Sequence, residues 1–511
     1  MKLSTIIELK RMAFRNLSRH RVKTVLTVMA IAVSVAVYIF VDGWLVGMNL
    51  ESRRNIVIYE MGAAKFQTKA YFEKQDERPM YENFADWQKY ADALDKAGYD
   101  SAPRFVFTGI LYSETSSAPI EFNAVDPSAD QNLLRYASYV ESGRFIKNGE
   151  FAIVLGNVTA DKLKVGIQQR PTQLDLEELS AETSDPSFVL GLYEPIQQSG
   201  GGMFAPKETA PAPGNGRFAL KKGVSQADLD KYWMLLDETG RNNTILSIVI
   251  DIKDETGKIR HVNQLIPVKV VGLINSPNPK TNNNIAWIPM DVLQDDAGLM
   301  LDGHITELLI RKKNADDAAI PGKDESAPAI TQALQTVLGD LLPEDLAVFG
   351  WQGYAQNYLA TASGDDWSSR IMVIILFILS FLGIANTMLL SILERTKEIG
   401  MMRAQGMTDG ELIVMYMLEA GMAGFFGAVF GVIAGCLINI PMVKYGIDFS
   451  VMTESLGGNI GYRVNGAFRS AWNIPVIIGC PLAAIALSAV MALFPTRRSL
   501  KMPVTESLRF E

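Results

Sequence analysis

A stretch of mixed charge, Glu394–Met407, lies between two long apolar segments. Its residue types and their spacing suggest a functional site. Two acids, Glu394 and Glu398, stand among basic residues around an apolar Ile-Gly-Met-Met centre. The spacing predicts a short helix, and Gly400 and Gly406 permit close backbone approach or helix termination. An ordinary basic loop with snorkelling side chains would account for the bases, but not for the acids and the apolar centre. We therefore interpret the stretch as a docking helix for a protein partner.

Residue types that catalyse reactions or bind metals show no informative spacing. His20, His261 and His304 are far apart in sequence, and no H-E-x-x-H, C-x-x-C or G-x-S-x-G motif occurs. No G-x-x-x-x-G-K-[ST] phosphate loop occurs, which excludes nucleotide hydrolysis by that route. Cys436 and Cys480 both fall in apolar segments, so no disulfide framework is expected. We expect no catalytic residue, no metal site and no cofactor in this chain, which is not predicted to be an enzyme.

The composition predicts a membrane protein with a large water-exposed part. Of 511 residues, 48% are hydrophobic and 20% are charged, and the mean hydropathy is +0.11. A soluble protein is usually more polar, and a bundle made only of membrane helices is far more apolar. The net charge of −8 argues against a nucleic-acid partner, because a phosphate backbone requires clustered basic surface.

Four apolar runs are each long enough to cross a hydrocarbon core, which takes about 20 helical residues. They are residues 22–46, 371–393, 412–440 and 474–494. Basic residues cluster before the first run, in the 394–411 loop and in the 495–511 tail. The positive-inside rule places these three clusters in the cytoplasm. The sequence therefore predicts two cytoplasmic termini, with residues 47–370 and 441–473 on the far side of the membrane.

The N-terminal residues 1–21 are predicted to form an interfacial helix. Apolar residues at positions 6, 9, 13, 14 and 17 share one helical face, with basic residues on the other; a merely charged flank is the alternative. A cleaved signal peptide is the competing interpretation of the first apolar run. That run exceeds the roughly 7–15 residues of a signal-peptide core, and no small-x-small site precedes a polar mature sequence.

Small residues in the third apolar run predict close helix packing. Ala423, Gly427, Gly431 and Gly435 recur at four-residue spacing, which lets helix backbones approach closely in lipid. Asp42 lies near the outer end of the first run, and an acid within a membrane span is a functional candidate. At that depth, however, we expect it to reach interfacial water.

The large external segment, residues 47–370, is predicted to be a mixed α+β domain in two lobes, because it exceeds a typical single domain. Helical patterns occur at 81–97 and 327–342. Strand patterns occur at 151–155, 246–252, 267–274, 285–288 and 307–310. Residues 167–245 read as an elaborated insertion. The Gly/Pro/Ala-rich stretch 197–216 within it predicts a mobile loop, either a gating or substrate-contacting element or a passive solvated one.

Several segments together resemble FtsX-like ABC transporter permeases, including the MacB and LolC/LolE types. The 393–407 loop resembles the coupling loop of that family, residues 495–509 resemble its C-terminal pattern, and residues 13–26 resemble its N-terminal helix. Pieces of the external segment, within 143–166 and 268–273, resemble the MacB-type periplasmic core. The fold that this resemblance implies is four transmembrane helices with an α+β periplasmic domain inserted between the first and second.

The resemblance also implies the partners. Two permeases, identical or paralogous, would form a dimer in the inner membrane, and each would contact one ATPase subunit that binds ATP and Mg²⁺. The missing phosphate loop departs from MacB, which carries its own ATPase domain, and fits LolC/LolE, whose ATPase is a separate polypeptide. The expected ATPase-coupling residues are Glu394, Arg395, Lys397, Glu398, Ile399, Gly400, Arg403, Ala404 and Gly406.

Three outputs remain open for such a permease. The first expectation is that it transmits ATPase motion to the periplasmic domain and so extracts or moves lipoproteins or other amphiphiles. The second is MacB-like efflux of peptides or hydrophobic small molecules with a periplasmic adaptor. The third is FtsX-like signalling to a cell-wall hydrolase, without transport.

Overall fold

The protein is described from a computed structural model that covers residues 3–19, 21–195, 217–221, 223–253, 258–296, 301–315, 327–448, 464 and 467–503. The predicted loop at 197–216 therefore lies outside the described residues, as does most of 441–473. The chain forms two compact units. The first comprises Met1–Leu50, Ala360–Asp448 and Ala467–Glu511, and the second comprises Glu51–Leu359 and Phe449–Gly466.

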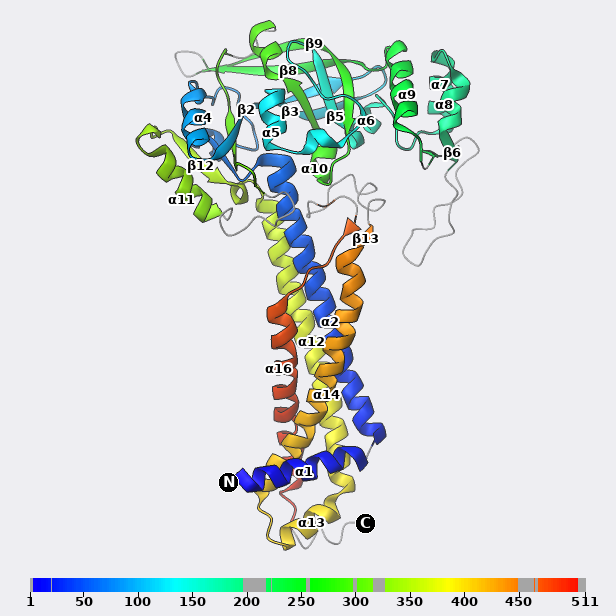
Figure 1. Cartoon of the computed structure of the whole chain (residues 1–511), viewed down its shortest axis with the longest axis vertical. Coiled ribbons are helices and arrows are strands. Elements are labelled where there is room, and N and C mark those ends of the chain that lie inside the picture. Colours follow the sequence, from blue (N-terminus) through cyan, green and yellow to red (C-terminus); the bar gives the residue numbers. More distant parts are fainter. Residues whose placement is uncertain are drawn as a thin grey trace. The chain divides into compact units, whose positions relative to one another are not determined.

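The first unit is helical (Figure 1). The helices that lie wholly or mostly in it are α1 (Leu3–Arg19), α2 (Arg21–Asn55), α12 (Gln356–Glu394), α13 (Thr396–Ala404), α14 (Asp409–Lys444), α16 (Ile474–Met491) and α17 (Leu493–Ser499). A two-stranded sheet pairs β13 (Ile447–Asp448) with β14 (Ala467–Phe468). Among the described residues, three helical segments are long and apolar enough to cross a membrane: Thr24–Met61, Asp409–Lys444 and Ile474–Ser499. The second predicted span lies wholly inside the continuous helix α12, and the count of four spans stays a prediction.

Helix α14 packs closely on α2 along its glycines. A methyl group at Gly431 would lie 2.7 Å from Val35 Cβ and 2.8 Å from the carbonyl oxygen of Ala32. A methyl group at Gly427 would lie 2.7 Å from Ile31 Cβ, and the space beside Gly435 is similarly occupied by α2. Ala423 is buried on the same helix. Only a residue without a side chain fits these contacts, so the spacing of the small residues fixes how near the two helices come.

The second unit is built on a ten-stranded mixed sheet in the part of the chain that the structure describes. The strands are β1 (Ala64–Thr68), β2 (Tyr99–Tyr112), β3 (Ser117–Val125), β4 (Val140–Gly143), β5 (Ala152–Gly156), β8 (Asn243–Lys253), β9 (Ile259–Ile274), β10 (Ile285–Pro289), β11 (Glu307–Lys312) and β12 (Leu346–Gly350). The spatial order is β12-β1-β11-β2-β3-β10-β5-β9-β4, with β8 paired to both β2 and β9. Most pairs are antiparallel, whereas β10 with β3 and β5 with β9 are parallel. The mixture of helices and strands is confirmed, and each of the five predicted strands falls in β5, β8, β9, β10 or β11.

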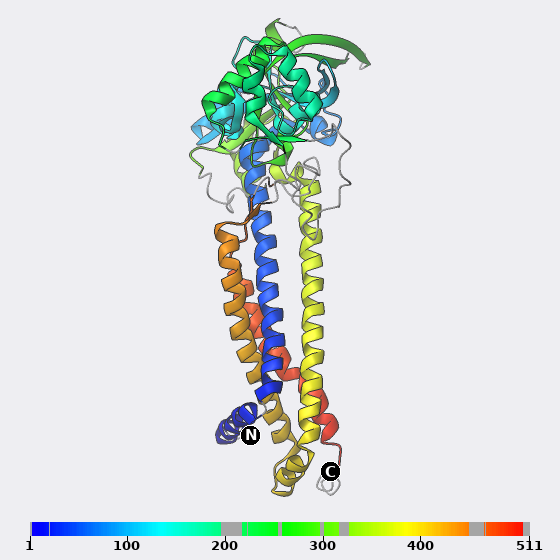
Figure 2. The same cartoon turned by 90° about the vertical axis from the view of Figure 1, so that its right-hand side faces the viewer.

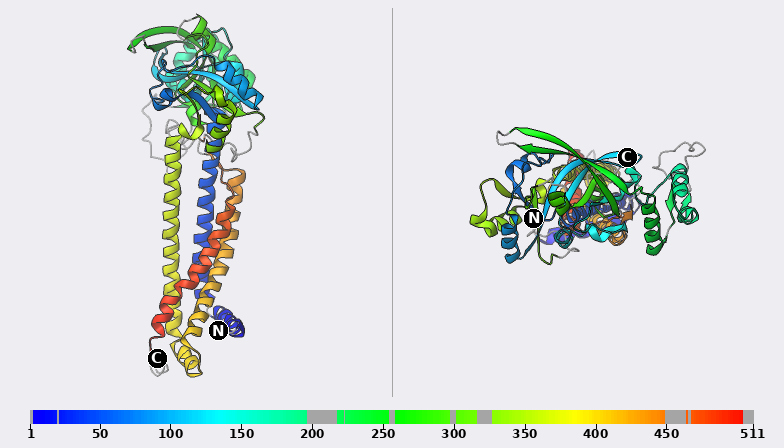
Figure 3. Two further views of the ribbon diagram at one scale, coloured as in Figure 1. Left: turned by 90° about the vertical axis from the view of Figure 1, so that its left-hand side faces the viewer. Right: turned by 90° about the horizontal axis from the view of Figure 1, so that it is seen from above.

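Helices cover this sheet and its edge (Figure 3). They are α3 (Lys69–Glu73), α4 (Trp87–Lys96), α5 (Pro127–Leu133), α6 (Asn157–Leu163), α10 (Pro279–Asn282) and α11 (Ala327–Leu338). The helix predicted at 81–97 starts only at Trp87, so the prediction was wrong for residues 81–86. Phe84 bridges Ile305 with backbone hydrogen bonds, and Asp86 has a left-handed φ of 53°, so the chain is not helical before Trp87.

The segment predicted as an insertion forms its own small apolar cluster. It contains α7 (Gln173–Glu182), α8 (Pro186–Leu192), β6 (Tyr193–Pro195), β7 (Phe218–Leu220) and α9 (Gln226–Glu238). Val189, Tyr193 and Tyr232 are buried together there, and the two tyrosine hydroxyls lie 3.2 Å apart. A separate buried cluster around Tyr136, Val154 and Trp287 forms the core against the sheet.

We predict that Gly431→Ala destabilises the helical unit by about 1–3 kcal/mol, because the new methyl group would overlap a side chain and a backbone oxygen of α2. Thermal unfolding of the purified protein in detergent would measure this change. Gly479→Ala is the matched control, since nothing lies within 4 Å of its added methyl group on α16. Equal melting temperatures for the two variants would contradict the close packing of α14 on α2.

Candidate functional site

The mixed-charge stretch folds as a short helix between two long ones. Helix α12 ends at Glu394, Arg395 follows, and α13 covers Thr396–Ala404. Thr396 Oγ1 donates to the Leu393 carbonyl oxygen at 2.8 Å, which supports the start of α13. Gly406 has a φ of +97°, a left-handed conformation that disfavours other residues and turns the chain after α13. The loop therefore has a defined shape.

Helix α14 begins directly after this turn. Thr408 caps it through a reciprocal pair of contacts with Glu411: the Glu411 backbone N–H donates to Thr408 Oγ1, and the Thr408 backbone N–H donates to the Glu411 carboxylate. Such a capping box satisfies N–H groups that a helix start would otherwise leave open. Both ends of the short segment after α13 are thus fixed by local contacts.

Burial separates the predicted coupling residues into an inner and an outer set. Arg395, Ile399 and Gly400 are buried, and Glu398 and Arg403 are half-buried. Glu394, Lys397, Ala404 and Gly406 are exposed. Within α13, Lys397, Met401 and Ala404 follow a spacing of four and then three residues, so they share one helical face, which we call the outer face of α13. Met401, which the sequence reasoning did not single out, is 48% exposed on this face.

The inner side of the loop is held by a buried ion pair. Arg395 Nη1 lies 3.6 Å from Glu419 Oε2 of α14, and the two side chains are only 5% and 7% exposed. Asn16 Nδ2 of α1 donates to the same carboxylate oxygen at 3.2 Å. Three segments far apart in sequence meet at one acid. Arg395 therefore positions the loop from within, and its side chain offers no surface to a partner.

Sequence reasoning missed Glu419, although a signal was present. Glu419 is the single charged residue in the predicted span 412–440. An acid in such a segment is rare and marks a specific partner or role. Its partner, Arg395, lies 24 positions earlier, outside the range in which helical spacing predicts contact, so only the folded chain reveals the pair.

Apolar contacts complete the support of α13. Ile399 is buried in a cluster with Leu9 of α1, Ile392 of α12 and Met415 of α14. Leu500, just beyond α17, joins the same cluster. Figure 2 shows α13 at the same end of the helical unit as α1 and α17. The apolar centre of the stretch thus packs inward through Ile399, while Met401 points outward.

Arg403 is also engaged by its own chain. Its Nη1 donates to the Met502 carbonyl oxygen at 2.8 Å, and its Nε lies 3.1 Å from Asp409 Oδ1. These contacts tie α13 to the segment after α17 and to the first turn of α14. The outer face of α13 is exposed and is available to another molecule.

Comparison with known proteins finds a match for this part of the chain. Residues 370–504 match the family model described as FtsX-like permease C-terminal, a range that includes α13, α14 and α17. This part of the chain is similar to the C-terminal region of FtsX-like permeases.

Similar curated proteins carry related names. An uncharacterised ABC transporter permease of Methanocaldococcus jannaschii is 25% identical over 58% of this chain and 66% of its own length. The macrolide export ATP-binding/permease protein MacB 2 of Aeromonas hydrophila is 23% identical over 54% of this chain and 40% of its own. The lipoprotein-releasing system transmembrane protein LolC of Neisseria meningitidis is 22% identical over 47% of this chain and 55% of its own. The matches thus span between 40% and 66% of these relatives.

We predict that Glu419→Ala destabilises the protein by about 3–5 kcal/mol, because it leaves the buried Arg395 charge without its partner. Asn16→Ala, which removes only the hydrogen bond from α1, should cost about 1 kcal/mol. Thermal unfolding in detergent would compare the two variants.

The double variant Arg395→Met/Glu419→Leu is the control for this prediction. It removes both charges, so it should be more stable than Glu419→Ala alone. If Glu419→Ala cost no more than Asn16→Ala, the ion pair would not hold the loop.

Proposed function

We propose that this protein is the permease subunit of a MacB- or LolC/LolE-type ABC transporter, and that the outer face of α13 receives motion from an ATPase on a separate chain. The observation that supports this most directly is the two-sided construction of α13. Its inner side is fixed by the Arg395–Glu419 pair and by Ile399, while Lys397, Met401 and Ala404 remain exposed. A surface that receives force requires such a rigid base.

Two features of the chain favour transmission of that force along a helix. Helix α12 is continuous over 39 residues, from Gln356 to Glu394, which is about 58 Å at 1.5 Å per residue. Its last residue adjoins Arg395, so a displacement of α13 acts directly on the end of α12. We propose that α12 transmits this displacement to the α+β unit.

The sequence of 511 residues contains no phosphate loop, which supports ATP and Mg²⁺ binding by a partner chain.

For topology and assembly, we propose an inner-membrane protein whose termini and α13 are cytoplasmic and whose α+β unit is periplasmic. The three clusters of basic residues in the sequence support this orientation. We further propose a dimer with a second copy or a paralogue, as the resemblance to this family implies. Each permease of the dimer would contact one ATPase subunit. The lipid bilayer is then the remaining partner, and α1 lies at its surface.

For the transported material, we propose lipoproteins or other amphiphiles as the leading class. The similarity to the LolC protein supports this class, as does the missing phosphate loop. Efflux of peptides or hydrophobic small molecules with a periplasmic adaptor is the second candidate, supported by the similarity to a macrolide export protein. Signalling to a cell-wall hydrolase is the third, supported by the FtsX-like family itself.

Depletion of the protein separates these candidates. Release of labelled lipoprotein from spheroplasts should fall if the leading proposal holds, and unchanged release would contradict it. Increased drug susceptibility of a deletion strain, dependent on the adaptor, would favour efflux. Co-purification of a hydrolase with the protein would favour signalling.

We predict that Lys397→Glu/Met401→Glu weakens binding of the partner ATPase, because it changes the charge of two exposed residues on the outer face of α13. The expected loss of about 1.4 kcal/mol or more corresponds to a tenfold or greater loss of affinity. Lys397 is a sharper target than Arg403, whose charge is already bonded to Asp409 and Met502. Stimulation of ATPase activity in reconstituted vesicles, titrated with the ATPase subunit, would measure the change.

The matched control is Lys96→Glu, a reversal at an exposed lysine on α4 of the other unit. It should leave ATPase stimulation unchanged. Wild-type stimulation by the double variant, with normal insertion and melting, would contradict docking at the outer face of α13.

A further inference from the structure

The helical unit contains an open groove that docking at α13 does not explain. Its volume is about 960 Å³, near the upper end of the roughly 300–1,000 Å³ that ligand pockets occupy. One wall comes from α12, and the other comes from the end of α16, from α17 and from a residue just beyond α17. Figure 3 shows α16 and α17, in red, beside the lower part of α12. All of these residues belong to one compact unit.

The α12 wall of the groove is almost wholly apolar. Leu382, Ala385 and Leu389 line it together with Asn386, at the spacing of one helical face. The predicted span 371–393, which contains all four, has no charged residue. From Leu382 to Leu389 the helix rises about 10 Å, less than half of a hydrocarbon core about 30 Å thick. The wall is therefore short enough to lie within one leaflet of a bilayer.

The opposite wall of the groove is apolar in its first part. Val490, Leu493 and Phe494 line it, again at the spacing of one helical face. Phe494 is 72% exposed, and Leu382 of the α12 wall is 59% exposed. Large apolar side chains are thus left open on both walls, which favours an apolar occupant between them.

Three cations line the other end of this wall. Arg497 and Arg498 lie three and four residues after Phe494, so they continue its helical face, and Lys501 lies just beyond the helix. All three are exposed. Among the described residues, none of their side chains has an ion pair or a hydrogen bond, and no acid lines the groove. Basic residues beside a span commonly set its orientation, but these three gather at the end of an apolar groove.

The basic end of the groove adjoins α13. Met502 directly follows Lys501, and its carbonyl oxygen accepts a hydrogen bond from Arg403 of α13 at 2.8 Å. On the other wall, Leu389 lies near the end of α12, which α13 follows. Both walls therefore run from their apolar part toward the same end of the helical unit. The cations lie where the headgroup of a lipid would lie if its acyl chains followed the apolar walls.

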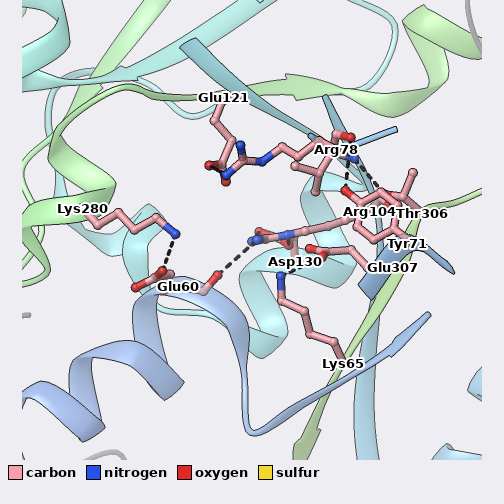
Figure 4. A network of polar contacts seen from close by, with 11 residues as sticks. Glu60, Lys65, Tyr71, Arg78, Arg104, Glu121, Asp130, Lys280, Thr306 and Glu307 are labelled. Carbon is pink, nitrogen blue, oxygen red and sulfur yellow. Dashed lines mark hydrogen bonds and ion pairs between the residues drawn. The ribbon is translucent and has the colours of Figure 1, made fainter. Parts of the chain in front are cut away.

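The charged cavity of the α+β unit differs from this groove in how its charges are satisfied (Figure 4). There, Lys65 Nζ lies 2.6 Å from Glu307 Oε2, and Lys280 Nζ lies 2.6 Å from Glu60 Oε1. All four residues line that cavity, so its wall supplies its own opposite charges. The groove of the helical unit carries cations alone among the described residues, so a bound anion would be complementary to it.

We propose that this groove binds an anionic phospholipid, with its phosphate beside Arg497, Arg498 and Lys501 and its acyl chains along the two apolar walls. Basic pockets between membrane helices attract anionic headgroups, and the apolar walls bury acyl carbons. A zwitterionic phospholipid would bring no net charge to the cations. A second copy of this chain is a poorer match, because its span 371–393 carries no charge and would leave the cations unpaired.

Binding would be tested with the full-length protein, stripped of lipid in detergent, by native mass spectrometry, which reports bound lipid and oligomeric state together. The probes are phosphatidylglycerol, phosphatidylcholine with the same acyl chains, and inorganic phosphate. We expect phosphatidylglycerol to bind at least tenfold more tightly than phosphatidylcholine, and inorganic phosphate not to be retained. Equal affinity for the two lipids, or retention of inorganic phosphate as strong as that of phosphatidylglycerol, would overturn the proposal.

The decisive variant is Arg497→Gln/Arg498→Gln/Lys501→Gln, which removes the three charges and keeps the apolar walls. Its affinity for phosphatidylglycerol should fall tenfold or more, toward that for phosphatidylcholine, because each cation near the headgroup contributes to the attraction. Thermal unfolding in detergent would show that the variant is folded.

The matched control for charge is Lys10→Gln/Arg11→Gln/Arg21→Gln, which removes three exposed cations of α1 and α2. It changes the net charge by the same amount and should bind phosphatidylglycerol normally. Equal losses of affinity in the two triple variants would indicate a general attraction of anionic lipid to basic surface and would contradict a site in the groove.

The apolar walls are tested without a change of charge. Ala385→Trp fills the groove from α12 and should weaken binding of phosphatidylglycerol, whereas Leu390→Trp adds the same side chain at an exposed position of α12 outside the groove and should not. Unchanged affinity in Ala385→Trp would contradict the place assigned to the acyl chains.

The same spectra distinguish a lipid from a second copy of the chain. A change of oligomeric state in Ala385→Trp, with lipid binding unaltered, would assign the groove to a second copy and overturn the proposal. These measurements use no ATPase, so their outcome is independent of whether α13 couples to a partner.

Discussion

The buried contact between Arg395 and Glu419 is the constraint on which the helical unit depends. A charge in a nearly dry site is stable only beside its counter-charge, so Arg395 cannot move away from α14 without a large cost. Because Arg395 immediately precedes α13, this restriction applies to the whole loop. The buried Arg395–Glu419 pair, which no partner can contact, therefore fixes the position of the exposed residues of α13.

The glycines of α14 impose a second constraint within the same unit. They bring α14 so close to α2 that a single methyl group would overlap the neighbouring backbone. The Glu419 carboxylate lies on α14 two turns before Gly427, so the helix that anchors α13 is itself held against α2. Polar and steric constraints therefore act on one helix from different sides. We consider this the physical basis for treating α13 and its supporting helices as one mechanical element.

The sequence predicted what depends on local pattern and failed where distant residues decide. The helix at 396–404 and its turn at Gly406 follow from charge, spacing and a glycine, all of which are local. Strand β2 was missed, although only β9 is longer among the described strands of this sheet. Buried residues occupy both faces of β2 along its middle, so its sequence lacks the alternation of apolar and polar residues that indicates a strand. The ATPase-coupling set mixed inward residues such as Arg395 with outward ones such as Lys397, because spacing alone does not tell which side of a helix is covered. Met401 was missed for the same reason, whereas Glu419 was missed because its partner Arg395 lies 24 positions earlier in the chain.

The contact of Asn16 with Glu419 also sets an order of events during synthesis. The two residues are 403 positions apart, so at about 5–20 residues per second the ribosome needs roughly 20–80 s to complete the contact after α1 has emerged. Arg395, in contrast, precedes Glu419 by only 24 positions and meets it almost at once. The two charges of the ion pair are therefore synthesised within a short time of each other. Helix α1, in contrast, is synthesised long before Glu419, the residue that it contacts. Its basic residues and its apolar face suit it to spend that interval on a lipid surface.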